Sequence, residues 1–343
     1  MRVGILTGGG DAAGLNAAIR AVGRSALRHG DEVVGVVNGW AGLLGGAEVV
    51  ILDEQSFSGM LREGGTALGS SRTNPLAVEG GIARVQSSLA ELEIDALVAI
   101  GGDDTLSVAA ALAEAGTRVV GLPKTVDFDL AVTEYCIGFD SAVAIVSEAL
   151  DRLHTTAASH HRVMVCEVMG RDTGWLAVMG GLAGGADLVL IPEFPLSLDE
   201  VIARLDARQA SGKSYSIVVI AEGAAVEGLD ISPSDSATDA FGHMALSSKA
   251  VGDRLAQAIK ARTGHDTRAT VLGHVQRGGS PVASDRIWPT RLGVAAFDAL
   301  AEGKGGSCAV VADGTVQLVP LGDVVAEQKR VPRELYAIVD RVN

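Results

Sequence analysis

Two short stretches of the 343-residue chain combine carboxylates, hydroxyls and a lysine with glycines, in a pattern that suits chemistry on phosphates. The first runs from Gly101 to Thr105 and reads GGDDT, and the second runs from Pro123 to Asp129 and reads PKTVDFD. Backbone amides beside glycines can hold phosphate oxygens, while carboxylates can bind the Mg²⁺ that accompanies a phosphate. Either stretch alone would as readily be a solvated acidic loop, but the two together predict a site for a metal-bound phosphate.

Each stretch follows an apolar run that is typical of a buried strand in a parallel sheet. These runs are Ala96–Ile100 and Val119–Leu122. Open α/β sheets bind their ligands at the carboxyl ends of strands. We therefore expect both stretches to be loops at the ends of neighbouring strands, with their acids and lysine facing one cavity.

Other glycine-rich loops follow other predicted strands. Thr7–Asn16 (TGGGDAAGLN) precedes a helix predicted over 17–27, and glycines at a helix N-terminus favour an anion. This loop lacks a Walker A lysine, and the second predicted strand, 33–37, ends without the acid that a nicotinamide dinucleotide site requires. Gly64–Pro75 (GGTALGSSRTNP) adds Arg72, whose guanidinium can bind a phosphoryl group through two hydrogen bonds.

A second α/β unit begins just before a helix predicted over 142–156. That helix leads into an apolar strand, 163–168, which ends in the glycine-bearing loop Met169–Trp175. The same order of strand, glycine and polar residue recurs after 217–220 and after 269–272. Arginines at the ends of these strands indicate a pocket for a second anionic ligand in an otherwise acidic protein. They are Arg162, Arg171, Arg268 and Arg277.

Composition restricts the class of protein. The chain has 28 basic and 42 acidic residues, and the resulting net charge of −14 argues against binding to nucleic acid or to an anionic membrane surface. Hydrophobic residues make up 48% of the chain but aromatic residues only 3%, as is typical of doubly wound α/β sheets with aliphatic cores. The three cysteines lie far apart without metal spacing, which predicts reduced thiols in a cytoplasmic protein. We see no signal-peptide layout and no uncharged apolar run of about 18 residues, so we expect a soluble protein.

These motifs occur in an order that is characteristic of one family. They are GGGD at 8–11, GSSRTNP at 69–75, GGDDT at 101–105, PKTVDFD at 123–129, EVMGR at 167–171, AEG at 221–223 and GHVQRGG at 273–279. Over nearly its whole length the chain resembles the bacterial-type phosphofructokinases. Within that family it is most similar to the pyrophosphate-dependent, actinobacterial-like group, because it carries both Asp104 and Lys124.

The resemblance implies two Rossmann-like, three-layer α/β/α lobes with the active site in the cleft between them. Residues 1–138 plus 276–325 would form the larger, donor-binding lobe, and 139–275 plus 326–343 the smaller, sugar-phosphate-binding lobe. The implied activity is Mg²⁺-dependent transfer of a phosphoryl group to the C1 hydroxyl of fructose 6-phosphate. Because some phosphate-binding arginines of the family come from a neighbouring subunit, the resemblance also implies a homo-oligomer, a dimer or a tetramer.

The resemblance further implies a role for each matching position. Asp127 would be the base that takes the C1 hydroxyl proton, Asp103 would hold Mg²⁺, and Asp129 would support the base and a metal-bound water. The remaining positions are Thr125 and Arg171 for the transferring phosphoryl group, Gly10, Arg72, Gly102, Asp104 and Lys124 for the donor, Met169, Gly170 and Glu222 for the sugar, and Arg162, Arg268, His274 and Arg277 for the 6-phosphate. Such a set suits phosphoryl transfer, which depends mostly on positioning and on neutralisation of oxygen charge.

The expected donor follows from two of these positions. ATP-using members of the family have glycine where Asp104 stands, because the α-phosphate and ribose of the nucleotide pass there. A carboxylate there adds bulk and like-charge repulsion. Two unit charges about 4 Å apart at an effective dielectric of about 20 interact by roughly 4 kcal/mol, an upper-end figure for the steering available. Pyrophosphate users combine this aspartate with a lysine at position 124. Pyrophosphate is the expected donor, and ATP stays the alternative because some ATP-using relatives share the lysine.

Phe128 departs from the family pattern, which has asparagine between the two catalytic aspartates. Its ring could raise the pKa of the neighbouring base by desolvation, reshape the sugar site, or pack away from the cleft. Another phosphorylated sugar such as sedoheptulose 7-phosphate, or a specialised metabolite, is therefore an alternative acceptor. Two further classes stay open: a non-catalytic binding subunit and, with less support, a nicotinamide-dependent oxidoreductase.

Overall fold

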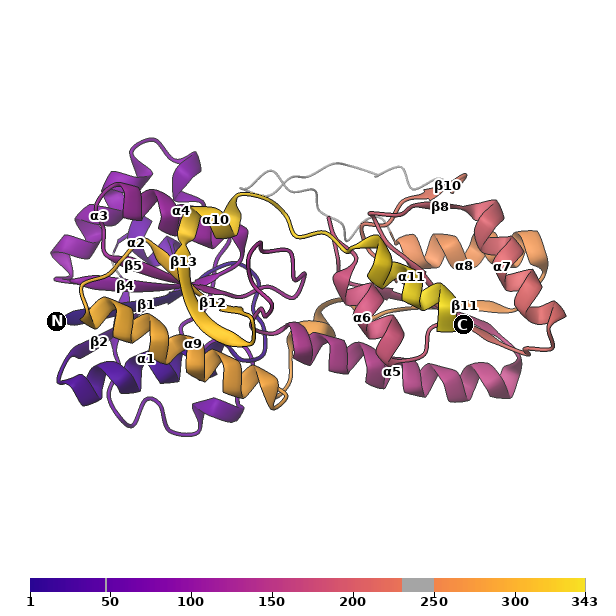
Figure 1. Ribbon diagram of the computed structural model, residues 1–343, viewed down its shortest axis with the longest axis horizontal. Coiled ribbons are helices and arrows are strands. Elements are labelled where there is room, and N and C mark those ends of the chain that lie inside the picture. The colour runs from indigo at the N-terminus through magenta and orange to yellow at the C-terminus, as the bar shows by residue number, and fades with distance from the viewer. Residues whose placement is uncertain (47, 230–249, 343) are drawn as a thin grey trace.

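The chain folds into two lobes that lie end to end (Figure 1). This computed structural model describes residues 1–46, 48–229 and 250–342. Each lobe is built around its own largely parallel sheet. The stretch Asp230–Asp239 is rich in serine and aspartate, which predicts an exposed loop, but it lies outside the described residues.

The larger lobe contains a seven-stranded sheet in the order β13-β12-β5-β4-β1-β2-β3. Its strands are β1 (Arg2–Thr7), β2 (Glu32–Val36), β3 (Val49–Ile51), β4 (Ala96–Gly101), β5 (Val119–Pro123), β12 (Ser307–Ala312) and β13 (Thr315–Pro320). The central strands are parallel, and only the edge strands β3 and β13 run antiparallel to their neighbours. β4 is buried along its whole length, as its unbroken apolar run predicts.

Helices cover both faces of this sheet, so the lobe has three layers (Figure 1). They are α1 (Leu15–His29), α2 (Ala41–Leu44), α3 (Gly81–Glu91), α4 (Asp103–Glu114), α9 (Ser284–Ala301) and α10 (Leu321–Val325). α1 packs on α9 over one face, whereas α4 packs on α3 and α10 over the other. A separate apolar cluster fills the α1 and α9 face, with Ile5, Ile19 and Leu292 fully or almost fully buried. Short 3₁₀ turns at Met60–Arg62 and Pro75–Ala77 lie in the connection between β3 and α3.

The smaller lobe has a four-stranded parallel sheet in the order β11-β6-β9-β7. Its strands are β6 (Val163–Val168), β7 (Leu188–Leu190), β9 (Ser216–Ala221) and β11 (Thr267–Val271), with a separate two-stranded pair of β8 (Leu196–Ser197) and β10 (Val226–Glu227). Its helices are α5 (Phe139–His160), α6 (Trp175–Ala183), α7 (Leu198–Ala210), α8 (Val251–Thr263) and α11 (Arg333–Val342). α5 packs on α6, and α7 packs on α8. A 3₁₀ turn, Gly273–Arg277, follows β11.

The chain passes between the lobes three times: into α5, from β11 to α9, and from α10 to α11 (Figure 1). Asp285, at the start of α9, ties two of these passages together. Its fully buried carboxylate accepts hydrogen bonds from the backbone N–H groups of Gly138 and Ser141 at 2.9 and 2.7 Å. The hydroxyls of Ser141, at 2.6 Å, and Tyr135 also donate to it. A carboxylate at the N-terminus of α5 is favoured by the helix dipole, so this contact fixes the helix that leads into the smaller lobe.

The division of the strands between the two sheets agrees with the fold class predicted from the sequence. The domain boundaries stay a prediction, although the change of sheet between β5 and β6 supports a boundary near Gly138. One local prediction was wrong, because Asp103 to Thr105 form the first turn of α4 rather than a loop. Gly102 caps that helix in an extended conformation, and acids in the first turn suit the positive end of the helix dipole.

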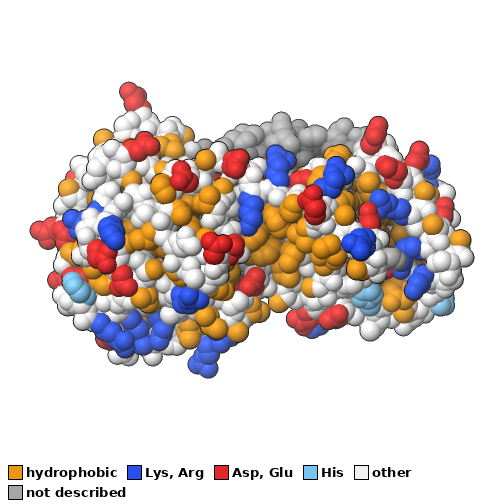
Figure 2. All heavy atoms as spheres, in the orientation of Figure 1, with side chains coloured by type: hydrophobic (Ala, Val, Ile, Leu, Met, Phe, Trp, Pro, Cys, Tyr) orange, Lys and Arg blue, Asp and Glu red, His pale blue; other side chains and the backbone are white. Residues whose placement is uncertain are grey.

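One face of the surface carries charges of both signs (Figure 2). Figure 2 shows acidic and basic side chains interspersed over one face, with hydrophobic side chains gathered near its middle. Within the described part of the chain, none of the helices has the length and apolar character needed to cross a bilayer.

Candidate active site

Two adjoining pockets lie in the cleft between the lobes, and several side chains border both. The smaller, of about 90 Å³, is lined by both predicted loops and by Arg171 and Asp172 of the smaller lobe. The larger, of about 510 Å³, is lined mainly by the ends of the strands of the smaller lobe. Asp127, Arg72, Arg171 and Arg277 line both pockets. Two ligands bound in these pockets would therefore meet at Asp127.

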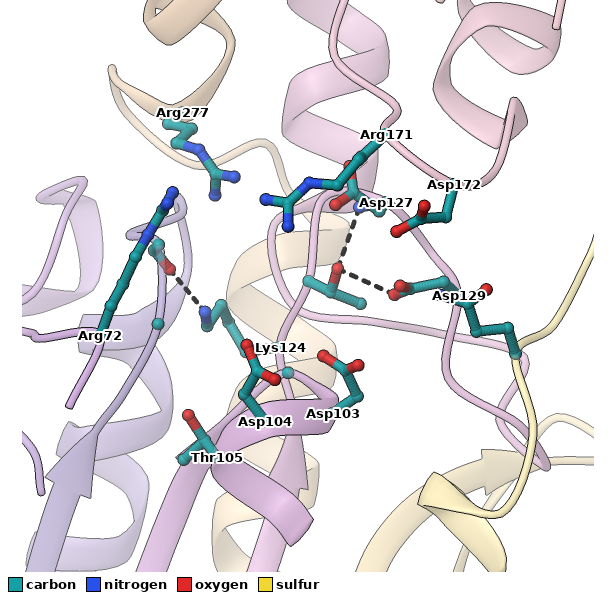
Figure 3. Close-up of a pocket in the computed structure, with 15 residues that line it drawn as sticks. Arg72, Asp103, Asp104, Thr105, Lys124, Asp127, Asp129, Arg171, Asp172 and Arg277 are labelled. Atoms are coloured by element: carbon teal, nitrogen blue, oxygen red, sulfur yellow. Dashed lines mark hydrogen bonds between the residues drawn. The ribbon is translucent and has the colours of Figure 1, made fainter. Parts of the chain in front are cut away.

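The first stretch, residues 101–105, brings its acids to the cleft through the pairing of β4 with β5. These strands are parallel, with Ile100 opposite Leu122 and Gly101 opposite Pro123, so both stretches leave the same edge of the sheet. Asp103 and Asp104 point from the first turn of α4 toward the cavity (Figure 3). The N-terminus of α4, which follows Gly102, faces the same space.

The second loop holds its two aspartates through Thr125. The Thr125 hydroxyl accepts a hydrogen bond from the backbone N–H of Asp127 at 3.0 Å and donates one to Asp129 Oδ1 at 3.2 Å (Figure 3). Phe128, between the two aspartates, has a φ of +54°, in the left-handed region. That conformation costs a non-glycine residue about 1–3 kcal/mol, and the loop uses it to turn both carboxylates toward one pocket.

The electrostatics of the pair favour proton binding. Burial raises the pKa of Asp127 above that of an ordinary aspartate, although the guanidinium groups of Arg277 and Arg171 oppose the shift. Burial, and after it the charges of Asp127 and Asp103, raises the pKa of Asp129 to about 7. Because the charge of Asp127 helps to raise the pKa of Asp129, the two acids titrate as a pair. A carboxylate of this kind suits general-base chemistry at physiological pH.

Lys124 is buried beneath the smaller pocket, with 3% of its side chain exposed. Its ammonium donates a hydrogen bond to the backbone carbonyl of Gly10, which brings the glycine-rich loop after β1 beside the second loop (Figure 3). Burial, and after it the charge of Arg277, lowers the pKa of Lys124 to about 7. A partly cationic group at this pocket is ready to bind an anion.

Unpartnered polar atoms in the cleft also indicate an anionic ligand. Among the residues that the structure describes, Arg171 Nε and Ser71 Oγ are buried without a hydrogen-bond partner. Such groups cost free energy unless a ligand or water satisfies them. Arg171 and Arg72 both point toward the cavity in Figure 3. Ser71 borders a third, shallower pocket beside the glycine-rich loop, with Gly10 and Arg72.

Arg277 comes closer to the donor side than its predicted role implies. Its Nη1 donates to the backbone carbonyl of Asp11 at 3.0 Å, and it lines both pockets. A Cβ on Gly10 would lie only 2.4 Å from Nη1, so any side chain at position 10 would displace the guanidinium. Glycine at position 10 is therefore needed for the close approach of this arginine.

The larger pocket contains four of the residues predicted to contact the acceptor. They are Met169, Glu222, His274 and Arg277. Gly170 adopts a φ of +137°, and an added Cβ would lie 2.6 Å from the carbonyl oxygen of Thr173, so a side chain there would disturb the turn. Burial, and after it the charge of Asp127, raises the pKa of Glu222 to about 6. A partly protonated Glu222 can donate hydrogen bonds to sugar hydroxyls and can accept hydrogen bonds from them.

Two predicted phosphate-binding arginines lie outside both pockets. Arg162 Nε pairs with Asp266 Oδ2 at 2.6 Å, and Arg268 Nη1 pairs with Asp266 Oδ1 at 2.5 Å. Both arginines are thus joined to one carboxylate at the start of β11. Within one chain, therefore, neither arginine lines the pockets of the cleft.

Phe128 packs away from the two pockets. Its ring stacks on Phe139, with centroids 4.5 Å apart, and meets Trp175 edge-on at 5.2 Å. The contacts join the second loop to the first residues of α5 and α6. Of the three effects considered from the sequence, the geometry agrees with packing away from the cleft.

Several pocket residues were not predicted, among them Asp172, Glu167 and Gln328. Asp172 lines the smaller pocket and follows Arg171 directly, so its place after a strand was a usable signal. Glu167 lines the larger pocket from inside β6 and accepts a hydrogen bond from Gly252 N–H at 2.7 Å. Gln328 reaches the smaller pocket from the segment between α10 and α11. No local pattern marks Gln328, because its position depends on a pairing with Leu130, far away in the sequence.

Comparisons with known proteins agree with this arrangement. The family model described as phosphofructokinase matches residues 2–300. The chain is 50% identical over 339 residues to the pyrophosphate–fructose 6-phosphate 1-phosphotransferase of Amycolatopsis methanolica, covering 98% of each chain. It is 44% identical to ATP-dependent 6-phosphofructokinase 3 of Streptomyces coelicolor, again covering 98% of each chain.

A solved structure has the same fold. The crystal structure of phosphofructokinase from Pichia pastoris superposes with a TM-score of 0.82 and 34% identity, over 95% of this chain and 35% of that longer chain.

Proposed function

The chain belongs to the phosphofructokinase family, and we propose that it transfers a phosphoryl group from pyrophosphate to the C1 hydroxyl of fructose 6-phosphate. The observation that carries this proposal is the position of Asp127, which borders both the acidic, phosphate-suited pocket and the larger pocket of the smaller lobe. The similarity to named pyrophosphate-dependent relatives over the whole chain supports it.

In the proposed reaction, Asp127 accepts the proton of the C1 hydroxyl as that oxygen attacks the terminal phosphorus of pyrophosphate. The new O–P bond forms while the bridging P–O bond breaks, and the bond's electron pair leaves with orthophosphate. Arg171 and Thr125 bind the transferring group, and its equatorial oxygens carry the charge that the guanidinium neutralises. Arg171 Nε is buried without a partner among the described residues, and this supports the role.

The residues on the donor side suit pyrophosphate. Lys124, Arg72 and the backbone at Gly10 and Gly102 surround the smaller pocket and would bind the diphosphate. Asp104 lines the same pocket, where it would repel the additional phosphate of a nucleotide. ATP stays the second candidate donor, because relatives 43–44% identical are named ATP-dependent.

Mg²⁺ fits the donor pocket, where Asp103 would hold it, assisted by a water on Asp129. The described residues contain no cluster of three or more metal-ligating side chains, but Mg²⁺ commonly uses one or two carboxylates and completes its shell with water and substrate phosphates. When bound, the ion neutralises charge on the oxygens of the diphosphate. The chain's own contribution is to keep Asp103 aimed into the pocket from the first turn of α4.

The acceptor side is proposed to take fructose 6-phosphate. Met169, Gly170 and Glu222 would contact the sugar, and His274 and Arg277 its phosphate. Arg162 and Arg268 lie away from this pocket, and we propose that they serve the pocket of a second copy of the chain in a cytoplasmic homo-oligomer. Residues 1–138 with 276–325, and 139–275 with 326–343, are the proposed domains.

The test is a comparison of donors on the purified full-length chain. Fructose 1,6-bisphosphate formation is measured with fructose 6-phosphate and Mg²⁺, with either pyrophosphate or ATP. We expect turnover with pyrophosphate to exceed turnover with ATP. Turnover with ATP alone would contradict the proposed donor, and turnover with neither would contradict the proposed function.

A further inference from the structure

Lys329 contacts the proposed catalytic loop from the far end of the chain. It lies in the C-terminal crossover, which we define as residues 326–332, between α10 of the larger lobe and α11 of the smaller lobe (Figure 1). Its Nζ lies 3.7 Å from the centre of the Phe128 ring and donates a hydrogen bond to the Thr133 carbonyl at 2.7 Å. We propose that Lys329 is a positioning residue that orients Asp127 and Asp129 through Phe128, and this inference rests on the proposed function.

Backbone contacts place the crossover beside the loop. The backbone N–H of Lys329 donates to the carbonyl of Asp129 at 2.8 Å, and Leu130 forms an antiparallel bridge with Gln328. Phe128 is the one residue between the two aspartates, and it has the left-handed conformation. A change in the φ or ψ angle of Phe128 would turn the peptide groups that lead to Asp127 and Asp129, and a ring that is held in place opposes such a change.

The contacts of Lys329 and Phe128 also connect the loop to the smaller lobe. Trp175, the first residue of α6, donates from its indole N–H to the Lys329 carbonyl at 2.7 Å, and its ring contacts Phe128. The hydroxyl of Thr173 donates to the Asp127 carbonyl at 3.0 Å. Thr173 is two residues from Arg171, so the contacts that fix the base also fix its position relative to that guanidinium.

Chemistry explains why a cation is needed there. Lys329 is half-buried, and burial lowers the pKa of its ammonium below that of an ordinary lysine. Its ammonium contacts the faces of two aromatic rings and a carbonyl oxygen, which favour the cation, and the charge of Glu134 favours it as well. An apolar side chain of equal length would fill the space but would not hold the ring.

The experiment is a double-mutant cycle on the full-length chain between Lys329→Met and Phe128→Leu, with kcat and KM for both substrates. We expect each single variant to lower kcat about tenfold, with KM within about twofold, because small displacements of reacting groups are costly. The kcat of the double variant should be no lower than that of either single variant, since both changes remove the same interaction.

Lys329→Arg, which keeps a cation over the ring, should restore kcat to within about threefold of the unaltered chain. Lys304→Met is the control, because Lys304 pairs with Glu302 on the surface.

Other outcomes would overturn the proposal. Losses that multiply in the double variant would mean that Lys329 acts independently of Phe128, for example through Thr133. A lower melting temperature with unchanged kcat would make Lys329 merely structural. Turnover of the unaltered chain is measured first with each donor. Absence of any turnover counts against the proposed function. Losses of kcat that multiply in an active chain count against the positioning role alone.

Discussion

The backbone N–H of Asp127 donates a hydrogen bond to the hydroxyl of Thr125 at 3.0 Å. This short contact closes the loop after β5 so that the Asp127 carboxylate lies between the two pockets of the cleft. Because the same hydroxyl donates to Asp129, one threonine sets the position of both acids. The predictions below follow from this arrangement and from the groups that surround it.

Replacing Asp127 with asparagine should remove the base while leaving the loop closed. We expect kcat to fall by about 10²- to 10⁴-fold, the usual contribution of a general base. The melting temperature should rise, because burial opposes ionisation of this carboxylate, as its raised pKa indicates. Steady-state kinetics and thermal unfolding check the two expectations, and a variant with kcat within tenfold of the unaltered chain would exclude Asp127 as the base.

Replacing Asp104 with glycine should widen the choice of donor. The change removes bulk and negative charge from the smaller pocket, so we expect ATP-dependent turnover to rise at least about tenfold relative to pyrophosphate-dependent turnover. Asp104→Asn, which removes the charge but keeps the size, separates the two effects. If the ratio of ATP to pyrophosphate turnover were unchanged in both variants, Asp104 would not determine the donor.

Replacing Lys124 with methionine should abolish pyrophosphate turnover but stabilise the fold. The folded state lowers the pKa of this lysine to about 7 from an ordinary value of 10.5, so it disfavours the ammonium that the unfolded chain keeps. The unfolded state thus binds more protons between these pH values, and the stability of the unaltered chain rises with pH across that window.

The gain in melting temperature from Lys124→Met should therefore be full below about pH 7 and should shrink as the pH approaches 10.5. Thermal unfolding of both proteins across this range is the measurement, with Lys304→Met as the surface control. A gain that stays constant over the whole range would show that the buried ammonium is not its cause.

Replacing Phe128 with asparagine should leave the preference for the acceptor sugar unchanged. The ring packs on Phe139 and Trp175, outside the larger pocket, and asparagine tolerates the left-handed backbone. We expect a lower kcat, from the lost contact with Lys329, but the same ratio of turnover with fructose 6-phosphate and sedoheptulose 7-phosphate within about twofold. A shift of that ratio by tenfold or more would assign Phe128 to acceptor recognition.

The parts of the site that follow directly from strands were predictable. Ala96–Ile100 and Val119–Leu122 are unbroken apolar runs, and parallel pairing of buried strands brings the residues after them to one edge. The helical position of Asp103 was missed because the apolar period of α4 begins only at Leu106, although acids after a glycine are a helix-start signal.

The parts that depend on distant contacts were not predictable. The direction of the Phe128 ring is set by Trp175 and Lys329, which lie far away in the sequence. Gln328 reaches the pocket only because the crossover pairs with Leu130. No local periodicity or propensity carries such information, since the pairing is decided by tertiary packing.

The most direct test of the central claim is the fate of a labelled phosphoryl group. The purified chain is incubated with Mg²⁺, fructose 6-phosphate and ³²P-pyrophosphate, and the products are separated. We predict that half of the label consumed enters the C1 phosphate of fructose 1,6-bisphosphate and half appears as orthophosphate, and that Asp127→Asn stops both. Recovery of all consumed label as orthophosphate, with no labelled sugar bisphosphate, would contradict the account.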